Sequence, residues 1–235
     1  MKKILTPLIA VAMCLFFFLG AAHARLVISD AGRLLLRTKE NSIPVDESVT
    51  FGKVKNSDML FAAFGPESMP GVPAGLYLFK NRKLAKRLDI PDPDLCFTLS
   101  LSPNGSILAV DSGTSVVREW TFYNLATGKK VGNSVTYVSG SVDLFWMDNE
   151  RVLVTYPDGA PRECQTEQCS PLSVGIFNIS TGKIRDIFKG SDRCDFTLLD
   201  VSPAVITAEK LCLESRRDWA GYMGGKAPEI VSKSF

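Results

Sequence analysis

Two stretches of this chain repeat the same order of short apolar runs and turns, and this repetition constrains the fold more than any other feature. The first has runs at 97–101, 107–110 and 120–123 and ends in Asn-Leu-Ala-Thr-Gly-Lys; the second has runs at 142–146, 152–156 and 174–177 and ends in Asn-Ile-Ser-Thr-Gly-Lys. The two endings begin 54 residues apart, at Asn124 and Asn178. Short runs rich in β-branched and aromatic residues between turn signals indicate strands, and recurrence at such a period indicates a repeated structural unit.

Weaker copies of the unit extend the pattern in both directions. An earlier copy has runs at 60–64 and 76–79, and a later one begins at 196–199. After residue 24, no segment keeps apolar residues at helical spacing over three turns. We therefore expect an all-β protein.

The turns indicate how the strands of one unit connect. Ser102-Pro103-Asn104-Gly105 is typical of a tight hairpin between the first and second strands. In each Thr-Gly-Lys segment, the glycine supplies the positive φ that a reversal between the third and fourth strands needs. Each unit is therefore predicted to hold four antiparallel strands.

These motifs resemble the repeats of bacterial WD40-like and seven-bladed-type β-propeller proteins. The resemblance rests on Ser-Pro-Asn-Gly-x-x-Leu-Ala-Val at Ser102–Val110 and on Phe-x-x-x-Thr-Gly-Lys at Phe177–Lys183, and it covers roughly residues 50–210. It implies a small or incomplete β-propeller of about four four-stranded blades, fewer than such families usually have. The Gly-His and Trp-Asp pairs of WD40 repeats are missing. A β-sandwich, which shares these strand and turn patterns, is the alternative fold. In a closed propeller, the runs at 26–28 and 33–37 are expected to complete the last blade.

The first 24 residues have the three parts of a secretory signal peptide. Lys2 and Lys3 precede an apolar stretch, and Ala22-His23-Ala24 gives the small residues of a cleavage site. We therefore predict a signal peptide at 1–24, a single β-propeller-like domain at 25–235, and a periplasmic or secreted protein. An uncleaved membrane anchor is the alternative for this segment.

Five cysteines follow the predicted cleavage site, and export would permit disulfides among them. Cys194 and Cys212 lie nine residues to either side of Pro203, so a hairpin turning there would place them opposite each other. Cys164 and Cys169 flank a polar loop that a second disulfide would close. Cys96 is then expected to be a small buried side chain.

Composition excludes several classes of function. The chain has 27 Lys and Arg residues against 25 Asp and Glu, and removing Lys2 and Lys3 leaves these numbers equal, so no general charge favours nucleic acid or, after cleavage, a membrane. The only histidine, His23, lies in the predicted signal peptide. Histidine-based triads and zinc sites are therefore excluded from the remainder of the chain, and we predict no catalytic residue and no cofactor.

Two groups of residues suggest sites of binding. Asp89, Asp92 and Asp94 crowd three carboxylates into a proline-containing connection, which predicts a site for calcium or another hard cation; a solvated loop is the alternative. A second group combines arginines with aromatic residues outside any clear strand, which is typical of an interface; packing of this tail against the last blade is the alternative. It consists of Arg216, Arg217, Trp219 and Tyr222.

The function favoured by these observations is binding. We expect an exported, non-enzymatic β-repeat protein that binds a protein or ligand through loops on a rigid scaffold, with self-association through a blade edge as one form of partner. The alternative is a periplasmic hydrolase or lyase that uses carboxylates at the mouth of the propeller. Carboxylates clustered there would favour the enzyme, and an exposed apolar face or edge would favour the binding protein.

Overall fold

The computed structural model describes residues 25–37, 41–45, 49–114, 117–138, 144–158, 162–163, 168–202, 204–213 and 228–234. The predicted signal peptide lies outside these residues. The range 25–235, for which a single domain is predicted, falls into two compact units. Unit 1 comprises Asp58–Asp94 and the chain up to Lys53, and unit 2 comprises Val54–Ser57 and Leu95–Phe235. No helix in the described part of the chain has both the length and the apolar character needed to cross a bilayer.

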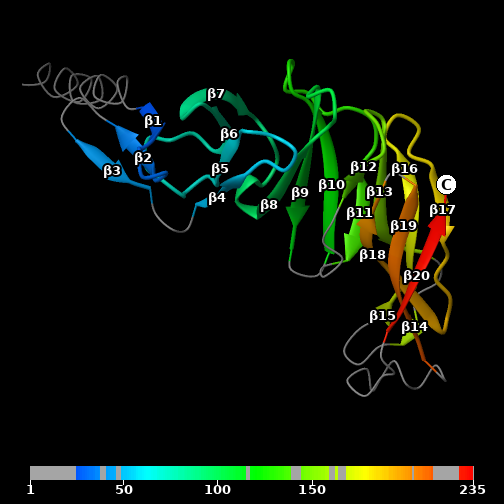
Figure 1. Ribbon diagram of the computed structural model, residues 1–235. Helices are drawn as coiled ribbons and strands as arrows, with labels where there is room; N and C mark the ends of the chain where they lie inside the picture. Colours follow the sequence, from blue (N-terminus) through cyan, green and yellow to red (C-terminus); the bar gives the residue numbers. More distant parts are fainter. Residues whose placement is uncertain are drawn as a thin grey trace, which may run out of the picture. The chain divides into compact units, whose positions relative to one another are not determined.

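Unit 1 contains two antiparallel sheets in which each strand pairs with its neighbours in the sequence (Figure 1). The first sheet has the order β1 (Arg25–Ile28), β2 (Leu34–Arg37) and β3 (Ser42–Pro44). The second has the order β4 (Thr50–Lys53), β5 (Leu60–Phe64), β6 (Gly75–Lys80) and β7 (Lys83–Leu88). A short 3-10 helix, η1 (Pro93–Leu95), follows β7 near the end of this unit.

One apolar cluster joins the two sheets of unit 1. Leu26, Ile28, Leu34 and Leu36 contribute from the first sheet, and buried residues of β5 and β6 contribute from the second. The alternate residues Leu26 and Ile28 share one face of β1 because successive side chains on a strand point to opposite sides. Burial of this face explains why so short a sheet is stable against the second one.

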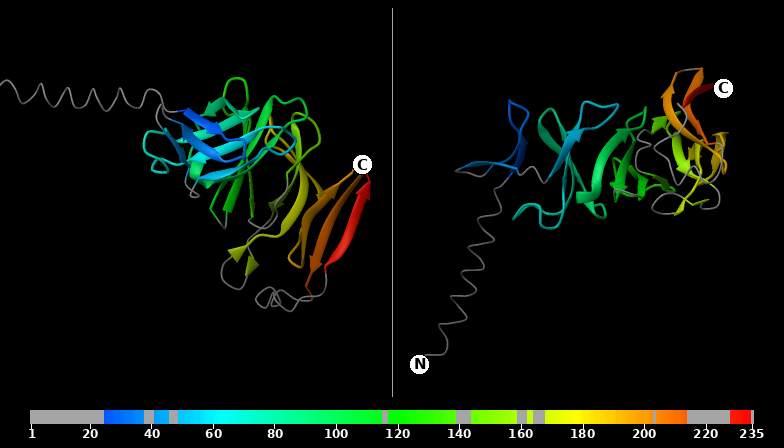
Figure 2. Two further views of the ribbon diagram at one scale, coloured as in Figure 1. Left: turned by 60° about the vertical axis from the view of Figure 1, so that its left-hand side comes forward. Right: turned by 90° about the horizontal axis from the view of Figure 1, so that it is seen from below.

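In its described residues, unit 2 contains three larger antiparallel sheets and one small hairpin. The β8 sheet comprises β8 (Cys96–Leu101), β9 (Ile107–Gly113), β10 (Val117–Asn124) and β11 (Val135–Val138). The β13 sheet comprises β12 (Phe145–Trp146), β13 (Arg151–Pro157), β16 (Leu172–Asn178) and β17 (Ile184–Phe188), and β14 (Arg162–Glu163) pairs with β15 (Gln168–Cys169). The β18 sheet comprises β18 (Cys194–Val201), β19 (Val205–Cys212) and β20 (Glu229–Ser234), which lie side by side in Figure 2.

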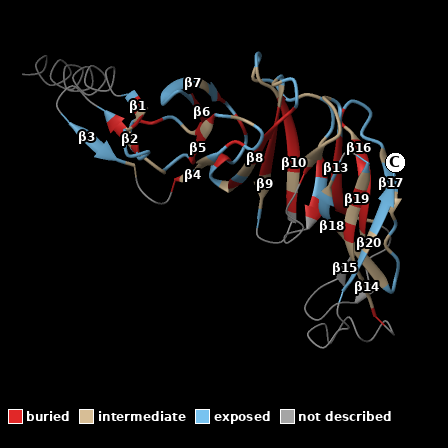
Figure 3. Cartoon of the chain, in the orientation of Figure 1, coloured by how far each residue is buried: buried red, intermediate tan, exposed pale blue. Residues whose placement is uncertain are grey.

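The two central strands of the β13 sheet, β13 and β16, are buried on both faces, and Figure 3 shows the buried residues of β13 in red. Val152 and Val154 pack in a cluster with Trp120 and Phe122 of the β8 sheet. Leu153, which points the other way, packs in a second cluster with residues of the β18 sheet. Three successive sheets are therefore stacked face to face, as propeller blades are, whereas a two-layer sandwich would leave an outer face of each sheet to solvent.

The two Asn-x-x-Thr-Gly-Lys segments form the same turn. Asn124 N donates to the Lys129 carbonyl and Asn178 N to the Lys183 carbonyl, both at 2.9 Å. In each turn the asparagine Oδ1 also accepts from the threonine amide, at 2.9 and 2.8 Å. The glycines have φ of 74° and 71°. The prediction that one sequence unit is one four-stranded antiparallel sheet is confirmed for both repeats.

The expectation that the N-terminal runs complete the last blade was wrong within the described residues. The runs at 26–28 and 33–37 pair with each other and with β3 in a sheet of their own. The last described sheet gains its third strand from β20 instead. The leucine-rich hairpin has a complementary apolar partner in the second sheet of unit 1, and this local packing decides where it lies.

Candidate functional site

Unit 1 contains a pocket of about 650 Å³ between its first sheet, the loop before β6, and the start of β7. We call it the basic-rimmed pocket. Its apolar walls come from Leu26, Val27, Leu36, Val72, Pro73 and Tyr77. Leu26, Leu36, Val72 and Tyr77 are also core residues with at most 9% exposure, so packing fixes the floor of the pocket in place.

Three cations line the same pocket, and no carboxylate does. Arg25, Arg82 and Lys83 are all exposed lining residues. Arg82 forms a 2.5 Å ion pair with Asp30, whose side chain is fully open to solvent. Arg25 and Lys83 have no ion-pair partner among the residues that the structure describes. The pocket is thus apolar inside and positively charged at its rim, which suits a ligand with an apolar body and a negative charge.

The loop that forms one wall is held by local hydrogen bonds. The Tyr77 hydroxyl donates to the Pro73 carbonyl at 2.6 Å, and Val72 N donates to the Met69 carbonyl at 3.2 Å. Burial raises the pKa of Tyr77, although the positive charge of Arg87 opposes the shift. The hydroxyl therefore stays protonated and keeps donating at neutral pH. A further hollow of about 530 Å³ runs along the same loop and includes Glu67.

A pocket of about 580 Å³ in unit 2, which we call the Trp146 pocket, adjoins the first strands of two sheets. Its lining includes Lys55, Asn56, Ser100, Phe145 and Trp146. The buried Ser100 hydroxyl accepts hydrogen bonds from Trp146 Nε1 at 3.1 Å and from Asn56 Nδ2 at 3.4 Å. These bonds fix the indole ring and the amide, so this pocket presents an ordered aromatic wall with polar groups beside it.

Unit 2 also contains a buried charged cluster on β9, β10 and β11. Arg118 Nε donates to Asp111 Oδ1 at 2.7 Å and to the Tyr137 hydroxyl at 3.0 Å, and that hydroxyl donates to Asp111 at 2.6 Å. The guanidinium lies 4.3 Å from the centre of the exposed Phe97 ring. These charge-assisted hydrogen bonds link three neighbouring strands.

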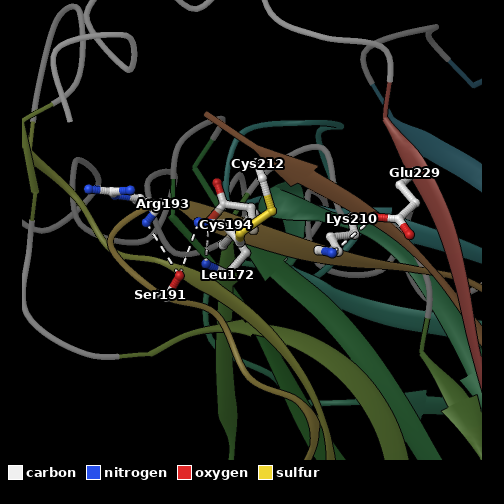
Figure 4. The surroundings of a disulfide bond; sticks show 8 residues. Leu172, Ser191, Arg193, Cys194, Lys210, Cys212 and Glu229 are labelled. Carbon is white, nitrogen blue, oxygen red and sulfur yellow. Dashed lines mark hydrogen bonds and ion pairs between the residues drawn. A yellow bond between two sulfur atoms is a disulfide. The ribbon is translucent and has the colours of Figure 1, made fainter. Parts of the chain in front are cut away.

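The structure joins Cys194 to Cys212 in the predicted disulfide (Figure 4). The two residues are direct partners in the register of β18 and β19, with a Cα–Cα distance of 4.1 Å. The neighbouring β20 is tied to the same hairpin by a 2.9 Å ion pair between Lys210 and Glu229. Cys96 is fully buried in β8, as predicted for it.

The structure does not gather the three predicted cation ligands into a site. Asp89, Asp92 and Asp94 are each exposed, and Asp89 lies 3.8 Å from Arg87, which competes with a cation for that carboxylate. Among the described residues no three acidic, cysteine or histidine side chains converge on a position for a metal ion. The exposure of all three residues is what the alternative, a solvated loop, leads one to expect.

The remaining predicted residues lie outside the described part of the chain. Arg216, Arg217, Trp219, Tyr222 and Cys164 are in undescribed segments, and of Cys169 only the backbone is described. Their interface and disulfide roles stay predictions.

The sequence did not reveal the basic-rimmed pocket. The only local sign of this pocket is that two strands begin with a cation, β1 with Arg25 and β7 with Lys83, which follows Arg82. Cations at the ends of strands are too common to indicate a pocket.

Fold and pockets together define an all-β protein built from small antiparallel, blade-like sheets, with pockets lined by apolar and cationic side chains. Comparison with models of known protein families finds no match, so the WD40-like assignment remains a resemblance. Comparison with curated proteins also finds no match.

Three solved structures are similar to this chain at low identity. A structure from a study of two prolyl endopeptidases is 17% identical with a TM-score of 0.45, over 82% of this chain and 29% of that one. A eukaryotic initiation factor is 16% identical with a TM-score of 0.39, over 72% and 41%. A post-proline cleaving enzyme from Rickettsia typhi is 12% identical with a TM-score of 0.40, over 87% and 31%. The chain thus spans less than half the length of each, and we draw no function from them.

Proposed function

We propose that this chain is an exported, non-enzymatic β-repeat protein that binds a ligand or protein partner in the basic-rimmed pocket. The observation that carries the proposal is the lining of that pocket, where an apolar floor meets Arg25, Arg82 and Lys83 without any carboxylate. Apolar walls supply affinity through burial, and a few placed charges fix the orientation of the bound molecule. The bound group therefore combines an apolar body with a carboxylate, sulfate or phosphate.

Export is supported by the signal-like N-terminus and by the Cys194–Cys212 disulfide. Disulfides persist in oxidising compartments such as the periplasm and are rare in the cytosol. These two observations support the proposal that the protein acts in the periplasm or outside the cell.

The enzymatic alternative lacks support in the described pockets. A carboxylate-based hydrolase or lyase needs two acidic groups that face each other across the substrate. The three pockets described above contain one acidic lining residue, Glu67, which lies in the hollow beside the loop of unit 1. The proposal therefore rests on what the basic-rimmed pocket can bind, namely its apolar walls and its cations.

Calorimetric titration with octanoate and with octanol tests this proposal, because the two differ in charge and share an apolar chain. We expect octanoate to bind at one site and octanol to bind more weakly. Replacing two rim cations, Arg25→Gln with Lys83→Gln, should weaken octanoate binding about tenfold, the sum of two exposed charge pairs.

The matched control removes the same charge from exposed residues of unit 2 that do not line the pocket, Lys183→Gln with Arg185→Gln. This variant should bind octanoate as the parent does. The proposal is contradicted if octanoate does not bind, or if both double variants weaken binding equally.

A further inference from the structure

We propose that the natural occupant of the basic-rimmed pocket is an extended acidic peptide that adds as a strand to the outer edge of β1. This inference rests on the proposed function, since it requires that the pocket hold an apolar and negatively charged group. It adds the class of partner and the backbone groups that recognise it. Recognition by strand addition combines backbone hydrogen bonds with pockets for alternate side chains.

The hydrogen bonds at the end of β1 show which of its backbone groups face outward. Ser29 N donates to the Arg33 carbonyl at 2.8 Å, in register with the pairing of Ile28 and Leu34. In an antiparallel pair, bonded and non-bonded residue pairs alternate. The N–H and C=O groups of Ile28 and Leu26 therefore point away from β2.

One of these two residues already has a partner, and the other does not. Ile28 N donates to the Arg82 carbonyl at 3.4 Å, so this amide points away from β2, and the turn between β6 and β7 covers that end of the edge. Leu26 has no backbone partner on that side among the residues that the structure describes. Because Leu26 also lines the basic-rimmed pocket, a ligand held there lies beside this edge of β1.

The side chains of β1 define the pattern of residues that a paired strand must have. Leu26 faces the buried cluster, and Arg25 points to the opposite, exposed side of the strand. A strand beside β1 would place every second side chain next to Leu26 and Val72, and the side chains between them next to Arg25. Alternating apolar and acidic residues meet both requirements, and Lys83 adds a second cation for the acids.

The test uses the full chain and the peptide Ac-Glu-Val-Glu-Val-Glu-NH2, which covers the Arg25–Val27 edge when it pairs antiparallel to β1 with a valine opposite Leu26. Two N-methylated versions separate strand addition from nonspecific capture. Methylation of both valines removes the N–H groups that would reach Leu26, whereas methylation of the outer glutamates removes N–H groups that point away from β1. We expect the parent peptide to bind, the valine-methylated one to bind at least tenfold more weakly, and the glutamate-methylated one to bind as the parent does.

A lysine peptide, Ac-Lys-Val-Lys-Val-Lys-NH2, should not bind, and Arg25→Gln with Lys83→Gln should weaken the acidic peptide about tenfold. Equal binding of both methylated peptides, or of the lysine peptide, would overturn strand addition. If octanoate binds and the acidic peptide does not, this inference fails and the proposed function stands. If neither binds, both fail.

Discussion

Arg118 is a charged residue buried in unit 2, and hydrogen bonds from its guanidinium to two side chains offset the loss of hydration. Asp111 and Tyr137 each bond to its Nε, and the Gly113 and Thr114 carbonyls lie 3.4 Å from Nη1. The Nη2 atom is buried without a hydrogen-bond partner. The stability of a buried guanidinium with one unsatisfied donor depends strongly on its remaining hydrogen bonds, because water cannot reach it to replace them.

Asp111→Leu should therefore lower the free energy of unfolding by about 3–5 kcal/mol, since it leaves Arg118 buried without its counter-charge. The double variant Asp111→Leu with Arg118→Leu should lose less than the single variant, because it removes the unpaired charge as well. Urea denaturation of both variants measures the difference. A double variant less stable than Asp111→Leu would contradict this account of the cluster.

Gly182 in the second Thr-Gly-Lys turn is required by its backbone conformation and by its surroundings. Its φ is 71°, and a Cβ there would lie 2.9 Å from Asn133 Cγ. Gly182→Ala should lower the free energy of unfolding by about 1–2 kcal/mol, the cost of the left-handed region for a residue with a side chain. Gly71 is a matched control for the steric part, since it has φ of 80° with open space around it. Thermal unfolding of both alanine variants should show the larger loss for Gly182; equal losses would show that Asn133 adds nothing.

At the scale of the element, the β18–β19 hairpin is closed by a covalent bond. The disulfide links residues 18 positions apart, and closing a loop of that size stabilises a protein by about 3 kcal/mol in the chain-entropy account. Cys194→Ala with Cys212→Ala should lower the free energy of unfolding by that amount. A reductant should also lower the stability of this variant less than that of the parent, because the variant lacks the Cys194–Cys212 bond. A variant as stable as the parent would show that β20 and the apolar cluster hold the hairpin without the disulfide.

The strands that the sequence predicted are those whose own residues are buried. Thr98, Val110 and Phe122 lie in runs whose β-branched and aromatic residues pack between sheets, so their pattern is set by the core. Two of the strands that sequence reasoning missed are exposed edges: β7 contains Lys83, Lys86 and Arg87, and β20 is exposed at nearly every position. An edge strand is defined by pairing with its neighbour rather than by its own apolar pattern, and a single sequence does not show that pairing.

Of the two sites, the disulfide could be predicted from the sequence and the basic-rimmed pocket could not. The disulfide could be predicted because both cysteines belong to one hairpin, whose turn and register follow from the local sequence. The basic-rimmed pocket combines Arg25, Val72 and Lys83 from three separate segments. Their proximity depends on how two sheets pack in unit 1, and no local motif encodes that.

In the described chain, three buried tyrosines should lower the free energy of unfolding as the pH rises into the alkaline range. Burial raises the pKa of Tyr123 to about 12, with the Cys96 and Glu119 charges adding to the shift. Burial also raises the pKa of Tyr137 and of Tyr156, whose hydroxyls bond to Asp111 and Asp186. Because these folded-state values lie above the unfolded value near 10, their contribution is complete below about pH 10 and is lost as the pH rises through the folded-state values.

The free energy of unfolding should therefore fall between about pH 10 and pH 12. Tyr123→Phe should make this fall shallower by roughly 1 kcal/mol per pH unit, because it removes one of the protons that the folded state retains. Urea unfolding at a series of pH values measures the slope for both proteins. Parallel slopes would mean that Tyr123 titrates alike in the folded and unfolded states.

The central claim for the whole molecule is that a rigid strand scaffold uses the basic-rimmed pocket of unit 1 to bind an apolar, negatively charged group. The most direct measurement is the change in backbone amide NMR signals when octanoate is added to the isotope-labelled protein. We expect saturable shifts at Arg25–Val27, at Gly71 and Val72 beside the pocket, and at Lys83 and Leu84, with the strands of unit 2 unaffected. Shifts confined to unit 2, or no saturable shifts, would contradict it.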